Sequence, residues 1–199
     1  MTRIFALLTI LVIAAGCTPA TPDEPLEALG EFSLGHNVVV ASKAQKGPVS
    51  RDATEAEWVN AMTAAVAERF ERYEGTQLYH LGISVEGYML APKGIPVLYS
   101  PKSALIINVT AWDDAAGKKL NEEPEQFTVF ESTTGDTLLV GSGHERTKAE
   151  QLKGLSRNAV GRIEEWLLEQ HETNGWFNKI QSTVIDETDT TAKVEPEEG

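Results

Sequence analysis

The feature of this sequence that most constrains its fold is a change in the spacing of apolar side chains along the chain. Apolar and polar residues alternate over residues 78–90 and 104–112, which is the period of a strand with one buried face. Over residues 54–75 and 147–174 the apolar residues instead recur at the spacing of an amphipathic helix. Because each element has one apolar side, the strands and the helices must bury those sides against each other.

Each predicted helix begins with a capping box. Thr54 and Glu57 open the first helix, and Thr147 and Glu150 open the second. Each pair places a hydroxyl and a carboxylate where they can satisfy backbone N–H groups that lack a partner in the first turn. Glycine commonly follows the last turn, because it adopts the left-handed backbone conformation without strain. We therefore expect the helices to end at Gly75 and at Asn174-Gly175.

Three features of the helices bear on how they pack, and two of them leave a second interpretation open. Arg69 falls within the apolar arc of the first helix, and we expect its side chain to reach solvent past the helix end rather than to form a buried ion pair. Glu164 falls outside the apolar arc of the second helix and is expected to face solvent. Trp176-Phe177 follows the second helix, and we expect it to pack back onto the domain rather than to anchor a partner or a membrane.

Shorter patterns complete the predicted sheet. We expect a first strand over residues 32–41, two short strands over residues 126–131 and 137–141, and a returning strand at residues 118–120 after the turn-forming run 113–117. The predicted order is β-α-β-β-β-β-α. This order gives an α/β (α+β) two-layer sandwich, with an antiparallel or mixed sheet of about four to five strands and two amphipathic helices on one face.

The N-terminal segment predicts export and a lipid anchor. One arginine precedes an uncharged run from Ile4 to Ala15, which is typical of a secretory signal and shorter than the about 20 apolar residues that a membrane-spanning helix needs. The run ends in Ala14-Ala15-Gly16-Cys17, which resembles the lipobox of bacterial lipoproteins, although leucine is usual in place of Ala14. The resemblance implies that Cys17, the single cysteine, becomes the lipidated first residue of the mature protein. The alternatives are ordinary signal cleavage beside an incidental cysteine, and a cytosolic protein with an apolar start.

Composition divides the chain into four parts. Residues 1–16 are expected to be a lipoprotein signal peptide, and residues 17–30, with three prolines and three acidic residues, a flexible tether. Residues 31–182 are expected to form a single domain, and residues 183–199, with six acids and one lysine, a disordered acidic tail. Of the formal net charge of −13, only −6 falls on the domain, where 15 Lys and Arg face 21 Asp and Glu. This balance argues against a nucleic-acid partner, because phosphate binding needs clustered Lys and Arg.

The sequence contains no recognisable catalytic or metal-binding motif. The four histidines lack metal-ligand spacing, and a single cysteine excludes a disulfide framework, a Cys-rich zinc site and an iron–sulfur site. His80, Ser84 and Glu86 share a predicted strand face, but His80 and Ser84 would lie about 13 Å apart, whereas proton transfer needs about 3 Å. We therefore expect a protein that is not an enzyme and that binds neither a metal nor a cofactor.

The polar face of the predicted sheet is the best candidate for a binding surface. It combines hydrogen-bonding groups with two aromatic rings on the side opposite the helices. The alternative is that these residues are the ordinary solvated face of a half-covered sheet. The candidate binding residues are His80, Ser84, Glu86, Tyr88, Asn108, Thr110 and Trp112.

Several segments resemble known envelope lipoproteins. The strand and turn from Leu105 to Leu120, the run Gly141-Ser142-Gly143 and the helix end Ile163-Glu164-Glu165-Trp166-Leu167 are similar to uncharacterised lipoproteins of alphaproteobacteria. With the lipobox and the tether, the small α/β domain more distantly resembles the lipopolysaccharide-assembly lipoprotein. It also resembles the auxiliary lipoproteins of lipid-trafficking ABC transporters.

These resemblances imply a non-enzymatic accessory lipoprotein of the cell envelope. It would face the periplasm, be joined to the membrane through its N-terminal lipid, and bind an envelope protein during assembly or transport. Thr18 follows Cys17, whereas Asp at that position is the inner-membrane retention signal of enteric bacteria, so the outer membrane is favoured. The alternative function is a small-molecule, glycan or lipid binder that uses the polar sheet face.

Overall fold

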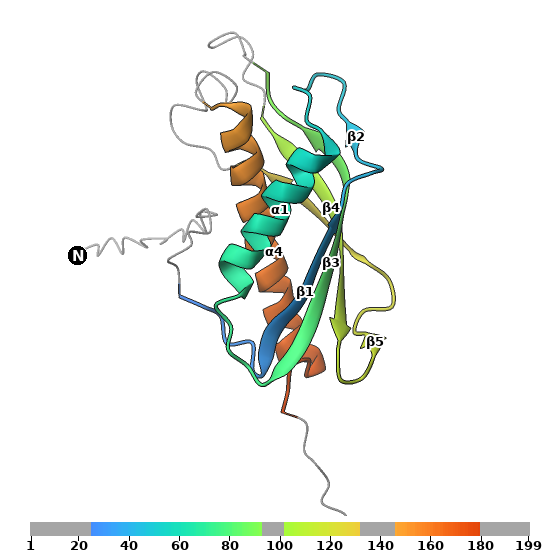
Figure 1. The fold of residues 1–199 in the computed structure, drawn as a ribbon, viewed down its shortest axis with the longest axis vertical. Coiled ribbons are helices and arrows are strands. Elements are labelled where there is room, and N and C mark those ends of the chain that lie inside the picture. The colour runs from blue at the N-terminus through green and yellow to red at the C-terminus, as the bar shows by residue number, and fades with distance from the viewer. Residues whose placement is uncertain (1–24, 93–101, 132–145, 180–199) are drawn as a thin grey trace, which may run out of the picture.

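A sheet and two helices form the two layers that the sequence predicts. The computed structural model describes residues 25–92, 102–131 and 146–179, and both helices lie on one side of the sheet (Figure 1). The predicted α/β sandwich is therefore confirmed. The elements, in chain order, are β1 (Phe32–Val40), β2 (Gln45–Lys46), α1 (Glu55–Phe70), β3 (Gln77–Met89), β4 (Ala104–Asp113), β5 (Lys118–Lys119), β6 (Glu125–Phe130) and α4 (Lys148–Asn174).

The sheet is mixed, with β3 and β4 at its centre. β1 runs parallel to β3, to which α1 connects it, while β4 runs antiparallel to β3 and β6 antiparallel to β4. β2 and β5 are short pairs of residues that hydrogen-bond to β3 and β4. Within the described ranges the sheet thus has six strands rather than the expected four to five. The strand predicted over residues 137–141 lies outside the described residues.

Both capping boxes form as predicted. The Thr54 hydroxyl accepts a hydrogen bond from the Glu57 backbone N–H, and the Glu57 carboxylate accepts one from the Thr54 backbone N–H. Thr147 and Glu150 make the same reciprocal pair at the start of α4. Local sequence therefore determines where each helix begins, because the residues that satisfy the first turn lie within that turn.

The two helices end differently from each other. α4 ends as predicted, with Gly175 in the left-handed conformation at φ 68°. α1 ends at Phe70, so the prediction that Gly75 stops this helix is wrong. Gly75 is needed for another reason, because a Cβ at this position would lie 2.1 Å from the carbonyl carbon of Glu31. The glycine lets two backbone segments approach each other closely.

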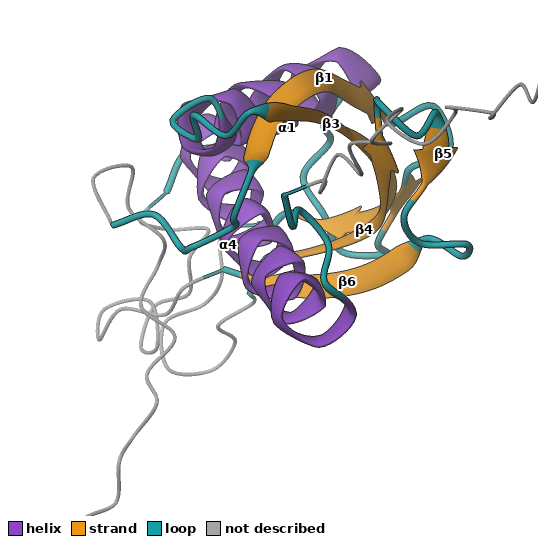
Figure 2. Cartoon of the chain, turned by 90° about the horizontal axis from the view of Figure 1, so that it is seen from below, coloured by secondary structure: helices purple, strands orange, loops and turns teal. Residues whose placement is uncertain are grey.

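The two helices run in the same direction and enclose the core with the sheet. Glu57 of α1 pairs with Lys148 of α4 at 2.5 Å, and further along Glu68 pairs with Arg157 at 2.7 Å. Figure 2 shows that the sheet curves strongly and that the helices close its open side. The largest fully buried side chains of this core include Phe32, Trp58, Met62, Phe70, Leu81, Ile83, Leu105, Ile107, Leu155 and Ile163.

The long elements extend between two ends of the domain. At the first, β1 and β3 begin, α1 and α4 finish, and residues 25–30 enter; we call it the strap end (Figure 1). At the opposite end β3 finishes and β4 and α4 begin. We call this the polar end, after a hydrogen-bonded cluster around Arg51, Arg146 and Gln151.

Residues 25–30 pack against the domain, although the sequence assigned them to the tether. Leu29 is 2% exposed, and its carbonyl accepts a hydrogen bond from the Phe32 N–H at 3.2 Å. The Glu31 N–H donates to the carbonyl of Phe177 at 2.9 Å. The packed part of the chain therefore includes residues before residue 31. Two leucines in a proline- and acid-rich stretch are too few to form a periodic pattern, which is why the packing was not predicted.

The residues after α4 pack back onto the domain, as predicted. The ring of Trp176 meets that of Trp166 edge-on at 5.4 Å between centroids. Phe177 is 2% exposed, and its ring lies 4.6 Å from that of Tyr79 and 5.1 Å from that of Phe32. These aromatic contacts join the end of α4 to the start of the sheet, and they close the strap end.

Candidate functional site

One face of the sheet, which we call the outer face, points away from the helices. The strand registers place its side chains in rows across the sheet. Val38 of β1 lies beside Gly82 of β3, and Gly82 lies beside Thr110 of β4. The next row contains Val40, Ser84, Asn108 and Gln126, one from each of four strands.

Five of the seven sequence-predicted binding residues lie together on the outer face. Ser84 and Asn108 are direct cross-strand partners, and His80 and Trp112 form another such pair. Thr110 lies between these two rows. Alternation correctly predicted their shared face, because successive side chains of a strand point to opposite sides.

Tyr88 departs from the predicted alternation because β3 contains a bulge at Glu86. The register with β4 shifts between Val85 and Gly87, which leaves Glu86 without a cross-strand partner in that register. Beyond the bulge Tyr88 pairs with Leu105 and is 8% exposed. The prediction that Tyr88 lies on the outer face is therefore wrong.

The side chain of Tyr88 has a structural role in the core. Its ring lies 5.3 Å from that of Trp58. Its hydroxyl donates to the Ala53 carbonyl at 3.0 Å and accepts from the Ala53 N–H at 3.2 Å. Tyr88 thus fixes the chain that leads into α1. The glycine at position 87 was the one sequence signal for the bulge, because glycine inside a strand often marks one.

The centre of the outer face is almost free of charge, although 24% of the chain is charged. Apart from Glu86 at the bulge, the outward positions of β1, β3, β4 and β6 hold no Asp, Glu, Lys or Arg in the register. The charges near this face lie toward the strap end, where Asp114 contacts His80 and Lys119 of β5 lies 5.9 Å from the centre of the Trp112 ring. Several large apolar side chains are exposed on the outer face instead. Exposed fractions lie between 39% and 61% for Val38, Val40, Leu78, Trp112 and Phe130.

Four of these apolar residues were not among the predicted binding residues. Val38 and Val40 belong to the continuous run Val38-Val39-Val40, in which only Val39 is buried. Leu78 and Phe130 lie at the ends of strands, where alternation gives the weakest prediction of which side a residue faces. Such a combination, with few charges and exposed aromatic and aliphatic side chains, is typical of the centre of a protein interface.

His80 is held rigidly at the end of the outer face nearest the strap. Its Nδ1 accepts a hydrogen bond from the His36 backbone N–H at 2.8 Å, so the proton of the neutral ring is on Nε2, which contacts Asp114 Oδ1 at 2.9 Å. The rings of His36 and His80 lie 4.7 Å apart. Gly35 makes this possible, since a Cβ there would lie 2.4 Å from His80 Nδ1. No group of three or more metal-ligating side chains occurs in the described part of the chain.

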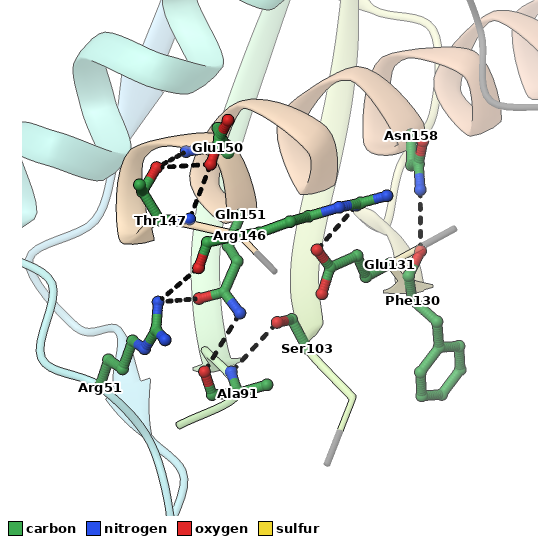
Figure 3. Close-up of polar contacts among 10 residues, drawn as sticks. All are labelled: Arg51, Ala91, Ser103, Phe130, Glu131, Arg146, Thr147, Glu150, Gln151 and Asn158. Carbon is green, nitrogen blue, oxygen red and sulfur yellow. Dashed lines mark hydrogen bonds and ion pairs between the residues drawn. The ribbon is translucent and has the colours of Figure 1, made fainter. Parts of the chain in front are cut away.

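The polar end contains the most extensive hydrogen-bonded cluster (Figure 3). Arg51 Nη1 donates to the Arg146 carbonyl at 2.9 Å and to Gln151 Oε1 at 3.3 Å. The fully buried Gln151 donates through Nε2 to the Ala91 carbonyl at 3.1 Å, and the Ala91 N–H donates to Ser103 Oγ at 3.1 Å. The cluster therefore joins the ends of β3 and β4 to the first turn of α4.

An ion pair between Arg146 and Glu131 extends this cluster to the end of β6. Arg146 Nη1 contacts Glu131 Oε1 at 2.8 Å, and the Glu131 side chain is 2% exposed. The other carboxylate oxygen, Oε2, is buried without a hydrogen-bond partner. The Glu131 N–H donates to the Ser103 carbonyl at 3.0 Å. Sequence analysis missed these residues, because they come from connecting segments that carry no periodic pattern.

The strap end contains a buried ion pair. Arg69 Nε lies 2.8 Å from both carboxylate oxygens of Glu164, and the two side chains are 7% and 6% exposed. Arg69 Nη2 also donates to the Pro25 carbonyl at 2.8 Å, and the Tyr73 hydroxyl donates to Glu164 Oε1. Burial raises the pKa of Tyr73, and the hydrogen bond to the Glu164 carboxylate raises this pKa further.

This cluster overturns two expectations. Arg69 does not reach solvent past the helix end, and Glu164, 5% exposed, does not face solvent. The signal that could have found the pair was the arginine inside an apolar arc, which required a carboxylate opposite it. Which carboxylate that would be depends on how the two helices pack, and the sequence does not contain that information locally.

The two helices form a groove of about 510 Å³ on the side of the molecule away from the sheet. Its lining includes three alanines of α1 and the Glu68–Arg157 ion pair. None of the sequence-predicted binding residues lines it. As for membrane insertion, neither described helix has the length and apolarity that spanning a bilayer requires.

Comparison with known proteins gives weak structural similarities only. No protein-family model and no curated protein matches the chain. A protein of the DUF330 family from Xanthomonas campestris is 14% identical with a TM-score of 0.43, the match covering 79% of this chain and 96% of that one. A candidate lipoprotein from Caulobacter crescentus (13% identity, TM-score 0.33, 67% and 93% covered) and a minor lipoprotein from Acinetobacter baumannii (18%, 0.26, 67% and 94%) are also similar. All three TM-scores lie below 0.5, so these similarities do not establish a family or a function.

Proposed function

We propose that this chain is a cell-envelope lipoprotein, anchored through a lipid on Cys17, that binds a protein partner through its outer face without catalysing a reaction. The observation that carries the proposal is the near absence of charge from the centre of the outer face, in a chain whose net charge is −13. The proposed location is the periplasmic side of the outer membrane, because Thr18 is not the inner-membrane retention residue.

The outer face suits a protein partner better than a small ligand. Small-molecule sites are concave and enclose most of the ligand. The rows across the outer face instead contain small side chains, such as Gly82, Ser84 and Thr110, flanked by the exposed Val38 and Val40. A Cβ at Gly82 would meet no atom closer than the Thr110 carbonyl at 3.8 Å, so the space above this strand is open. An open surface on the convex side of a curved sheet, without an enclosing cavity, suits another protein surface better than a small ligand.

The anchor is tested by changing Cys17 to Ser. The wild-type chain should incorporate radiolabelled palmitate and sediment with membranes, and the Cys17→Ser chain should lose both properties. Because Cys17 is the only cysteine, no other thiol can replace it. If Cys17→Ser remains membrane-bound with unchanged electrophoretic mobility and label, the lipoprotein proposal is wrong.

The outer face is tested by placing a charge at its centre. Ser84→Arg should abolish recovery of a stoichiometric partner from detergent-solubilised envelopes, since an interface would bury the new charge without a counter-ion. The matched control is Asn60→Arg on the exposed side of α1, which adds the same charge and should leave recovery unchanged. Equal recovery with both variants would assign binding to another surface.

A further inference from the structure

We infer that residues 25–29 form a strap that holds the strap end of the domain toward the membrane, so that the outer face is presented sideways to a protein anchored in the same membrane. The inference rests on the proposed lipid anchor and deepens the proposed function by naming the kind of partner. It depends on three observations: where the packed chain begins, how firmly it is held there, and which way the sheet runs from that point.

The packed chain begins next to the ends of both helices. Leu29 is buried, and Gly30, in the left-handed conformation at φ 56°, passes so close to the chain after α4 that a Cβ would lie 2.6 Å from the Phe177 carbonyl. The hydrogen bond from Glu31 to the same carbonyl follows directly. Residues 29–31 are therefore fixed against the last residues of the domain rather than free to swing.

Arg69 holds the strap at Pro25, four residues before Leu29. Its guanidinium donates to the Pro25 carbonyl, while Glu164 holds the same guanidinium through both carboxylate oxygens. Tyr73 donates to Glu164 and so limits its orientation. A charged donor held in a buried, bidentate pair gives a strong and directional hydrogen bond to the backbone. The first described residue, Pro25, is thus held to the domain through its carbonyl.

The remaining link to Cys17 is short. Eight Cα-to-Cα steps separate Cys17 from Pro25, and they can span at most about 29 Å. α4, with 27 residues, is about 40 Å long and runs from the polar end to the strap end. Because the link is shorter than α4, the strap end lies on average nearer to the lipid anchor than the polar end.

The direction of the strands then determines how the outer face is presented. β1 and β3 both start at the strap end and run toward the polar end, so the rows of the outer face rise one above another from the membrane. The outer face is therefore turned sideways, roughly perpendicular to the membrane plane, and a partner binds it from the side.

The orientation is tested by energy transfer from the lipidated full-length chain to a membrane dye. Acylated Cys17 has no free thiol, so Glu172→Cys at the strap end and Lys102→Cys at the polar end, both exposed, each provide a unique labelling site. In vesicles of phosphatidylethanolamine and phosphatidylglycerol with an acceptor-labelled lipid, a donor at position 172 should be quenched several-fold more strongly than a donor at position 102. Equal quenching at the two positions would overturn the orientation.

The strap itself is tested in the same assay with Leu29→Ser. Release of the strap would lengthen the link, so the difference in quenching between positions 172 and 102 should shrink. Leu78→Ser, a matched change at a half-exposed leucine, should leave the difference intact. If Leu29→Ser unfolds the domain, thermal melting will show it, and the wild-type pair of labels still decides the orientation. Loss of the acyl label from the wild-type chain would refute the anchor, whereas equal quenching with the acyl label present refutes only the orientation.

The kind of partner is tested with full-length Cys17→Ser chain carrying a photoreactive amino acid at Val40. After it has been added to spheroplast envelopes and irradiated, the cross-linked product should stay with the membranes through an alkaline carbonate wash, because the partner is anchored there. The same photoreactive group at Asn60 should give no such product. A Val40 product that the wash releases, or no product at Val40, would contradict a membrane-anchored partner.

Discussion

The strap end and the polar end are each held by an arginine paired with a buried glutamate, but the two pairs differ in how completely the glutamate is satisfied. Glu164 binds Arg69 through both oxygens and also accepts from Tyr73, and both members of the ion pair are buried. Glu131 contacts Arg146 through one oxygen, leaves the other unpartnered, and its arginine is 25% exposed. The strap end is therefore built to stay fixed, whereas the polar end retains unused hydrogen-bonding capacity.

The largest effect on stability is expected from Arg69→Met. This change leaves the Glu164 carboxylate buried without its counter-ion, which costs about 3–5 kcal/mol in comparable cases. Urea unfolding measures the loss, with Lys153→Met on the exposed side of α4 as a control that should stay within about 0.5 kcal/mol of wild type. Adding Glu164→Gln to Arg69→Met should recover part of the loss, because the buried charge is removed. A loss below about 1 kcal/mol for Arg69→Met would contradict the role assigned to this pair.

Arg146→Met at the polar end should cost less. Glu131 loses one charged hydrogen bond, worth about 1–3 kcal/mol, and water can replace the partly exposed guanidinium. The same unfolding experiment compares the two ends directly. If Arg146→Met lowers the free energy of unfolding as much as Arg69→Met or more, the strap end and the polar end do not differ in this way.

Tyr88→Phe should destabilise the domain by about 1–2 kcal/mol, since both backbone groups of Ala53 lose their hydroxyl partner. It should leave partner recovery unchanged, because the ring lies in the core beside Trp58. Loss of partner recovery without loss of stability would instead place Tyr88 at the interface, as the sequence predicted.

The ion pair between Glu57 and Lys148 contributes a smaller, pH-dependent effect near the polar end. The hydrogen bond from Lys148, with that from the Thr54 backbone, lowers the pKa of Glu57 from 4.5 to about 2. A carboxyl whose pKa is lowered on folding stabilises the fold fully above its unfolded pKa, and the contribution disappears as the pH falls from 4.5 to about 2. Lys148→Met should therefore be slightly less stable than wild type at pH 6 and indistinguishable from it near pH 2. An unfolding difference that persists unchanged at pH 2 would exclude this cause.

How much could be predicted from the sequence follows from how local each feature is. Thr54 with Glu57, and Thr147 with Glu150, act within one turn, and the alternation around Ser84 and Asn108 needs only neighbouring residues. The fold class, and the shared sheet face of five of the seven candidate residues, were therefore predicted correctly.

Tyr88 was misplaced because one extra residue at the bulge reverses the sides to which all later side chains point. Arg69 and Glu164 lie 95 positions apart, and they meet only because the helices pack in parallel. Pro25 and Leu29 carry no periodic signal, so their packing depends on a cavity that the rest of the chain creates. The features that the sequence did not reveal are thus those that require the assembled domain.

The central claim is that the outer face is covered by a protein in the envelope. A single cysteine at Val38, which is 56% exposed in the isolated domain, tests it directly, because the acylated Cys17 does not react with maleimide. We expect the thiol of Val38→Cys to react readily in the purified chain and to be protected several-fold in intact envelopes, while Asn60→Cys on α1 reacts equally in both. Equal labelling of Val38→Cys in the purified chain and in the envelope would contradict the account.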